Sequence, residues 1–197
     1  MNHFDSAANT WDSEEKISSV LKLAEKTKAK LSPRENLDIL DFGCGTGLYG
    51  LAFLDQAKSI TGIDNSEGMI KVFNEKTEND PQVKSIQVDL EKENVSDKYD
   101  LIISSMTFHH LKNPEEMILK FKSMLKPHGE MAIVDLEKED GSFHPDNKSM
   151  GVNHHGFSTE ELTSWGKVAN LKVEISTINT INKNDREYHQ FLAVYRN

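Results

Sequence analysis

Short apolar runs alternate with helical segments along residues 37–136, and this alternation restricts the fold more than any other feature of the sequence. Five runs predict strands, at 37–42, 60–63, 83–88, 99–104 and 131–136. Apolar residues at helical spacing follow several of them, as Met69, Val72 and Phe73 illustrate. Strands that alternate with helices are typical of an α/β fold with a mainly parallel, doubly wound sheet.

The last forty residues predict one more helix and two more strands. Ser158 and Glu161 form the pattern of a capping box at a helix start. The runs 171–175 and 191–195 predict a terminal pair of strands, and such a pair favours an antiparallel hairpin. We therefore expect an α/β fold with a doubly wound, mainly parallel seven-stranded sheet that ends in a C-terminal antiparallel hairpin.

One domain, 1–197, is the expected organisation for a chain of this length. The pair Asp12 and Glu15 predicts the start of a first helix, so residues 1–33 are expected to form an N-terminal helical cap. Residues 137–157 show no periodicity and are long for a connection, which is typical of a lid or substrate loop.

Charge and cysteine content exclude several classes of function. The chain has 23 Lys and Arg against 32 Asp and Glu, a formal charge of -9, which disfavours nucleic acid and anionic membranes as partners. The single cysteine, Cys44, permits no internal disulfide and favours a reducing compartment. The first residues are too polar for a signal peptide, and no apolar run approaches the ~18 residues of a membrane helix. We expect a cytoplasmic protein.

A glycine cluster follows the first predicted strand: Gly43, Gly45 and Gly47, with Leu48, Leu51 and Ala52 at helical spacing behind it. The first such loop of a doubly wound sheet normally forms the floor of the ligand site. Residues 45–50 also fit the pattern G-x-G-x-x-G with Asp64 further on, so a dinucleotide-dependent oxidoreductase is one hypothesis. Against it, Asp41 would place a carboxylate beside the negatively charged pyrophosphate.

Three acids stand at the ends of three successive predicted strands: Asp41, Asp64 and Asp89. In such a sheet they meet at one edge, where they suit a positively charged nucleoside such as S-adenosylmethionine. Asp64 is placed to accept hydrogen bonds from ribose hydroxyls, and Asp89 from an adenine amino group. Each acid taken alone is also compatible with a plain turn or cap residue.

The motifs around these acids resemble those of the class I S-adenosylmethionine-dependent methyltransferases. Residues 40–47 (LDFGCGTG) resemble the first motif, 62–66 (GIDNS) the second, and 88–90 (VDL) the adenine-side motif. Residues 99–104 and 125–130 resemble the fourth strand and the turn before the fifth. The segment 4–12 is similar to the N-terminus of bacterial small-molecule enzymes related to the quinone-biosynthesis methyltransferases. The resemblance implies a Rossmann-like methyltransferase fold with S-adenosyl-L-methionine as cofactor.

The resemblance also implies which residues face that cofactor. Asp41 and the glycines would face the methionine moiety, Asp64 the ribose, and Asp89 the adenine. Met69 would pack beside the adenine or serve only as a core residue, and Trp11 would stack near the sulfonium or anchor the first helix. The full expected set is Trp11, Asp41, Gly43, Cys44, Gly45, Thr46, Gly47, Asp64, Asn65, Met69, Asp89, Leu90, Ser104 and Ser105.

Histidines near the same edge are the candidate catalytic residues. Methyl transfer chiefly needs alignment and exclusion of water, but a histidine that removes the acceptor's proton can add about 10²- to 10⁴-fold. His109 and His110 follow the fourth strand, and His155 lies in the 137–157 loop with His144 and His154. Each is equally compatible with an ordinary solvated loop residue. Together they suggest a metal, but the adjacent pair 154–155 and the lack of a second cysteine lead us to expect none.

The expected acceptor is a small molecule. No Asn-Pro-Pro-Tyr-like segment follows the fourth strand, which disfavours the branch that methylates adenine or glutamine amides, and the charge disfavours RNA. The acceptor, its atom type and the oligomeric state stay open. Besides the oxidoreductase, a catalytically silent S-adenosylmethionine-binding protein is the remaining alternative.

Overall fold

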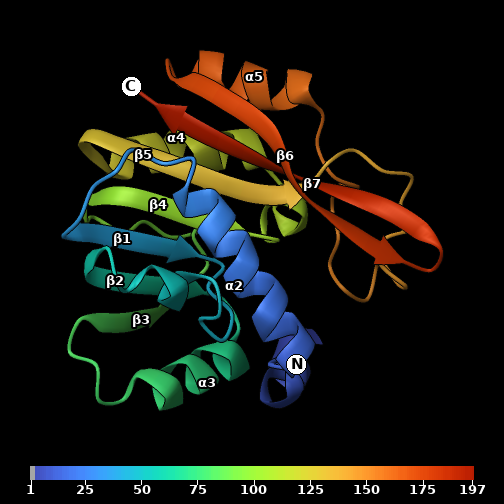
Figure 1. Ribbon diagram of the computed structural model, residues 1–197, viewed down its shortest axis with the longest axis horizontal. Coiled ribbons are helices and arrows are strands. Elements are labelled where there is room, and N and C mark those ends of the chain that lie inside the picture. Colours follow the sequence, from blue (N-terminus) through green and yellow to red (C-terminus); the bar gives the residue numbers. More distant parts are fainter. Residues whose placement is uncertain (1–2) are drawn as a thin grey trace.

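One seven-stranded sheet forms the centre of the molecule in the computed structural model, which describes residues 3–197. The strand order is β3-β2-β1-β4-β5-β7-β6 (Figure 1). Strands β1 to β5 pair in parallel, and β7 is antiparallel to both of its neighbours, β5 and β6. The strands are β1 (Leu37–Phe42), β2 (Ala57–Asp64), β3 (Val83–Gln87), β4 (Tyr99–Ser105), β5 (Leu125–Leu136), β6 (Lys172–Lys183) and β7 (Arg186–Arg196). The predicted doubly wound sheet with its terminal hairpin is confirmed.

The helices begin where the sequence supplies caps. The α-helices are α1 (His3–Ala7), α2 (Glu14–Lys28), α3 (Glu67–Thr77), α4 (Pro114–Met124) and α5 (Thr159–Val168). Ser158 caps α5 in the predicted capping box with Glu161. Helix α2 begins one residue later than expected, because Ser13 rather than Asp12 accepts from a backbone N–H of the first turn. No helix among residues 3–197 combines the length and apolar character that crossing a membrane requires.

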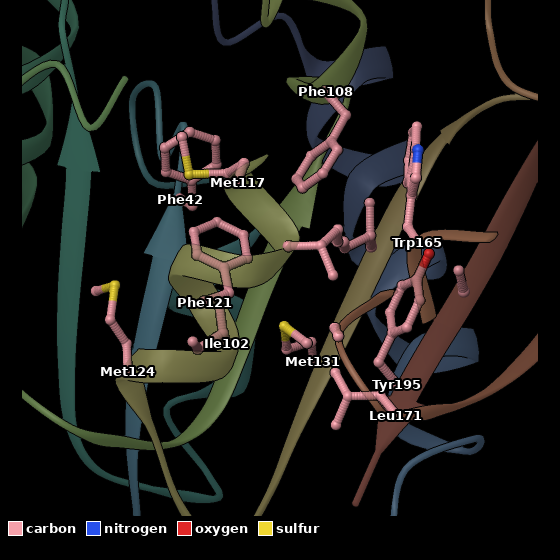
Figure 2. Packing of buried hydrophobic residues seen from close by; sticks show 14 of the residues in the cluster. Phe42, Ile102, Phe108, Met117, Phe121, Met124, Met131, Trp165, Leu171 and Tyr195 are labelled. Carbon is pink, nitrogen blue, oxygen red and sulfur yellow. The ribbon is translucent and has the colours of Figure 1, made fainter. Parts of the chain in front are cut away.

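Helices α4 and α5 cover one face of the sheet through an aromatic-rich core (Figure 2). Phe121 of α4 packs edge-on against Phe42 of β1, with ring centroids 5.1 Å apart. Trp165 of α5 packs against Phe157 at 5.1 Å, just before the helix begins. Phe121 and Phe157 are almost fully buried, and each such side chain contributes roughly 1.5–3 kcal/mol through the apolar area removed from water.

The opposite face is covered by α2 and by a short 3-10 helix, η2 (Gly50–Phe53). Leu23 and Ala24 of α2 pack into the same buried cluster as Tyr49 and Phe53. The prediction of a full helix behind the glycine cluster is therefore wrong, because the short 3-10 helix η2 forms there. Helix α2 supplies the apolar cover that this face needs, so part of the predicted N-terminal cap belongs to the core.

Several strand boundaries differ from the predictions. Strand β5 begins at Leu125, directly after α4, rather than at residue 131. The terminal strands run on to a two-residue turn, Asn184 and Asp185, whose φ angles of 51° and 57° suit a type I′ hairpin. The added hairpin residues include the buried Tyr188 and Gln190, but most of them are polar or charged, so they lack the apolar alternation by which strands are detected in a sequence.

Candidate active site at the carboxyl ends of the strands

The glycine loop leaves β1 and is held against β2. The backbone N–H groups of Gly43 and Cys44 donate to the Ile63 carbonyl at 2.8 and 3.0 Å. Gly43, Gly45 and Gly47 all have positive φ angles, of 69°, 51° and 89°. The loop conformation therefore requires residues without a Cβ, as the sequence predicted.

The surroundings of the three glycines differ. A Cβ on Gly43 would lie 2.2 Å from the Thr107 hydroxyl, and one on Gly47 would lie 2.8 Å from the Phe73 ring. At Gly45 the nearest atom would be 3.9 Å away, the sulfur of buried Met69. Gly43 and Gly47 are therefore packed against the protein, whereas Gly45 leaves room over its backbone for a ligand.

Asp41 lies beneath this loop and is 1% exposed. Its carboxylate accepts from the Gly50 backbone N–H at 3.1 Å. Burial raises the pKa of Asp41 to about 7, with the hydrogen bond from Gly50 opposing the shift and the charge of Asp64 adding to it. The acid is thus poised to ionise when positive charge arrives nearby.

Asp64 joins the end of β2 to the glycine loop. Its carboxylate accepts from the Gly45 N–H at 2.9 Å and from the Ser66 N–H at 2.8 Å. Burial raises its pKa, and the backbone donors partly offset this. Asn65, beside it, is exposed. Asp41 and Asp64 thus place two acidic groups against one loop.

Asp89 lies at the end of β3, and the Val88 N–H next to it donates to the Asp64 carbonyl at 3.0 Å. Burial raises the pKa of Asp89, but the ion pair with Lys92 at 2.7 Å and the backbone hydrogen bond from Glu91 outweigh it, and the net pKa is lowered. Leu90 is fully packed in the core. The three acids therefore do share one edge, although Asp89 is held by its own turn.

Three further predicted residues are held within the protein. Ser104 is buried and donates to the Phe42 carbonyl at 3.0 Å, while Ser105 is half-buried. Cys44 is buried, and burial raises its pKa well above the ordinary value, which leaves it an unreactive thiol. Thr107, which the sequence analysis did not select, is the side chain that packs against Gly43.

The N-terminal segment is fastened beside the glycine loop. The Thr46 hydroxyl donates to the Asp12 carboxylate at 2.6 Å. Lys76 of α3 pairs with Asp12 and donates to the Thr46 carbonyl at 2.7 Å. Asp5 accepts from the Ser66 hydroxyl at 2.7 Å. These polar contacts, absent from the sequence analysis, place residues 4–12 close to the loop and to α3 (Figure 1).

Trp11 lies on this segment, and its ring contacts one cation and one other aromatic ring. The Lys16 ammonium is 3.5 Å from the centroid of its ring, and Phe4 packs edge-on at 5.9 Å. Burial lowers the pKa of Lys16, and the nearby Asp12 opposes that shift. The cation that contacts the indole in this structure is thus the Lys16 ammonium. Stacking of Trp11 near the sulfonium of the cofactor stays a prediction.

A cluster of imidazoles lies at the same edge, beyond β4 and β5. His109 and His110 belong to the 3-10 helix η3 (Phe108–His110), and His144 comes from the loop after β5. Ring centroids are 4.0 Å apart for 109–110, 4.9 Å for 109–144 and 6.0 Å for 110–144. This confirms the expectation that the two loops meet.

His109 is the most constrained of the three. It is 1% exposed, and its Nδ1 lies 2.7 Å from a carboxylate oxygen of Asp135, which is fully buried. Asp135 also accepts from the backbone N–H groups of His109 at 3.2 Å and Leu136 at 2.7 Å. Burial raises the pKa of Asp135, but the His109 interactions outweigh it and the net pKa is lowered.

The remaining histidines are placed differently. His110 is half-buried, and its Nδ1 lies 3.1 Å from the Gly151 carbonyl. Burial, together with the other two imidazoles, lowers the pKa of His144 to about 4. His155 is exposed beside Glu139, with its Nδ1 3.7 Å from that carboxylate, and the structure does not bring it into the cluster.

Comparisons with known proteins identify methyltransferases as the relatives of this chain. The family model described as "Methyltransferase domain" matches residues 40–133. An uncharacterized methyltransferase of Schizosaccharomyces pombe is 34% identical over 154 residues, which cover 70% of this chain and 54% of that protein. A malonyl-[acyl-carrier protein] O-methyltransferase of Acetivibrio thermocellus is 32% identical over 133 residues, covering 66% and 47%.

The fold has solved counterparts over its full length. A chain of the solved complex "between the Haloferax volcanii Trm112 methyltransferase activator and the putative methyltransferase" has a TM-score of 0.84 at 18% identity, covering 100% of this chain and 98% of that one. At this identity the likeness concerns the fold. The chain spans about half the length of the two curated relatives.

Proposed function

Because the chain carries a class I, S-adenosylmethionine-dependent methyltransferase domain, we propose that it transfers a methyl group from S-adenosylmethionine to a small-molecule acceptor. The observation that carries the proposal is the contact between Asp64 and the Gly45 N–H at 2.9 Å. It joins the acid at the end of β2 to the only glycine of the loop triplet that leaves room over its backbone. Room for a ligand over the Gly45 backbone thus lies next to the acid that we expect to bind the ribose.

The residues at this edge of the sheet fit S-adenosylmethionine better than a dinucleotide. Asp64 would accept from the ribose hydroxyls, and Asp89 with Leu90 would border the adenine. The loop between Gly43 and Gly47 would lie against the methionine moiety, above Asp41. Two acids beside one loop oppose a pyrophosphate and favour a ligand with net positive charge.

When bound, S-adenosylmethionine supplies a methyl carbon that its sulfonium has already activated for in-line displacement. The chain's own residues then have to align the acceptor and exclude water. We assign the exclusion of water to residues 4–12, which are fastened through Asp5 and Asp12, and to the 137–157 loop. This assignment extends the predicted cap and lid.

Where the acceptor carries a hydroxyl or thiol, we assign proton removal to the histidines that follow β4. His110 is half-buried and therefore more accessible to an acceptor than His109, which Asp135 orients from within the core. His155 was the third candidate, but its position beside Glu139 gives that role no support.

Calorimetry tests the cofactor part of the proposal. We expect S-adenosylhomocysteine to bind and NAD to show no binding at the same concentrations. Asp64→Ala should weaken the binding at least about tenfold, whereas Asp185→Asn, an exposed acid in the hairpin turn, should leave it unchanged. Preference for NAD would instead support the oxidoreductase.

Transfer of label tests catalysis separately from binding. The protein is incubated with methyl-labelled S-adenosylmethionine and a metabolite extract, and label should enter an acceptor only when active protein is present. His110→Ala should slow transfer and leave cofactor affinity nearly unchanged. Binding without transfer across broad extracts would identify a silent S-adenosylmethionine-binding protein.

A further inference from the structure

We infer that His109, His110 and His144 form a binding site for one divalent transition-metal ion such as Zn²⁺. One ligand nitrogen from each residue lies within 4.8 Å of the other two. Nitrogens around a tetrahedral zinc ion lie about 3.3 Å apart, as bond lengths of about 2.0–2.1 Å require. Binding of an ion at tetrahedral geometry therefore requires the three side chains to draw closer together.

The fold places these ligands without relying on the methyl-transfer proposal. β4 and β5 are parallel neighbours, so the segments that follow them leave the sheet at the same edge. The N–H groups of Asn153 and His154 donate to the His109 carbonyl at 2.9 and 3.0 Å, which ties the 137–157 loop to η3. Two separate loops thus deliver ligands to one point.

The outer contacts of the imidazoles are those that orient metal ligands. His109 Nδ1 is 2.7 Å from Asp135, and His110 Nδ1 is 3.1 Å from the Gly151 carbonyl. Since both partners are acceptors, each Nδ1 carries the proton, and the ring lone pair is on Nε2. A carboxylate or carbonyl on the far nitrogen fixes the tautomer and increases the basicity of a metal-binding histidine.

Asp135 holds the His109 ring from inside the core. Its carboxylate is fully buried, and it accepts from the backbone N–H groups of His109 and Leu136 as well as contacting His109 Nδ1. These contacts fix the position of the carboxylate, and the carboxylate fixes the orientation of the imidazole, as the outer partner of a metal-binding histidine does.

Three nitrogen ligands select the class of ion. Imidazole suits zinc, copper, iron and nickel, whereas magnesium and calcium prefer oxygen ligands. Three protein ligands also leave a fourth position for water or another small ligand. With an ion bound, His110 is a ligand, so the role of proton acceptor proposed above belongs to the metal-free protein.

The test is a titration of the purified, tag-free and chelator-treated protein with Zn²⁺ against a chromophoric chelator. We expect one ion per chain, and at least about tenfold weaker binding in His144→Ala. His128→Asn and His189→Gln change exposed histidines outside the cluster and should bind as the original protein does. Co²⁺ should show the visible bands of a tetrahedral nitrogen-ligated ion, and these should be lost in His144→Ala.

His144 is the decisive position because it is half-buried on a loop, so its replacement is expected to leave the fold intact. Circular dichroism and the metal-free melting temperature verify this. Failure to bind one ion per chain would overturn the inference, as would equal affinities in His144→Ala and in the control variants. Because the readout is metal binding, either result leaves the proposed methyl transfer to its own test, and a bound ion changes only the proton-acceptor role assigned to His110.

Discussion

Asp41→Asn should abolish a large pH dependence of stability that this single buried acid introduces. The pKa of Asp41 is about 7 in the folded protein, against an ordinary value of 3.8. Between these values the folded chain binds a proton that the unfolded chain has lost, so the free energy of unfolding falls as pH rises from about 4 to about 7. At about 1.4 kcal/mol for each pH unit, the full loss is about 4 kcal/mol.

Urea unfolding at about pH 5 and about pH 8 measures most of this effect. Because of Asp41, the free energy of unfolding of the original protein should be about 3 kcal/mol lower at about pH 8 than at about pH 5. Asp41→Asn should lack this decrease. The asparagine oxygen can still accept from the Gly50 N–H. Asp185→Asn makes the same change of charge at an exposed turn and should retain the original pH dependence. Parallel pH dependences in both variants would refute the buried-acid account.

Three further predictions concern the same loop and one helix. Affinity for S-adenosylmethionine should rise as pH passes through about 7, because the cation favours ionised Asp41, and calorimetry should show this rise flattened in Asp41→Asn. Gly43→Ala should lower the melting temperature more than Gly45→Ala, since a Cβ would meet a neighbouring side chain at 2.2 Å in the first and nothing closer than 3.9 Å in the second; equal losses would contradict this. Ser158→Ala should lower the free energy of unfolding by about 1 kcal/mol in urea titrations, while the exposed Ser164→Ala on the same helix should not.

The parts of the fold that depend on local pattern could be predicted from the sequence. The strands β1 and β4 are rich in buried apolar residues, and the Ser158 cap is defined within four positions, so each carries its own signal. The glycine loop is also local, because its positive φ angles require particular residues.

The parts that failed depend on distant packing. Nothing near residues 48–54 indicates that α2 covers their face of the sheet, so the local spacing predicts a full helix where only η2 forms. Most of the outer hairpin residues are polar or charged, so the sequence predicts strands that are shorter than the observed ones.

Contacts between distant polar residues were the hardest part of the site to foresee. Asp12, Thr46 and Lys76 are far apart in sequence, and their contacts follow from how the N-terminal segment crosses α3. His109 and His144 could be placed at one edge from topology. Their ring separation and the buried carboxylate of Asp135 required the structure.

A crystal structure with S-adenosylhomocysteine tests the central claim most directly. The account predicts ribose hydroxyls on the Asp64 carboxylate, the amino-acid moiety over Gly45, and the sulfur directed toward the histidines that follow β4. A nucleoside bound elsewhere, or one at this edge without a contact to Asp64, would contradict it.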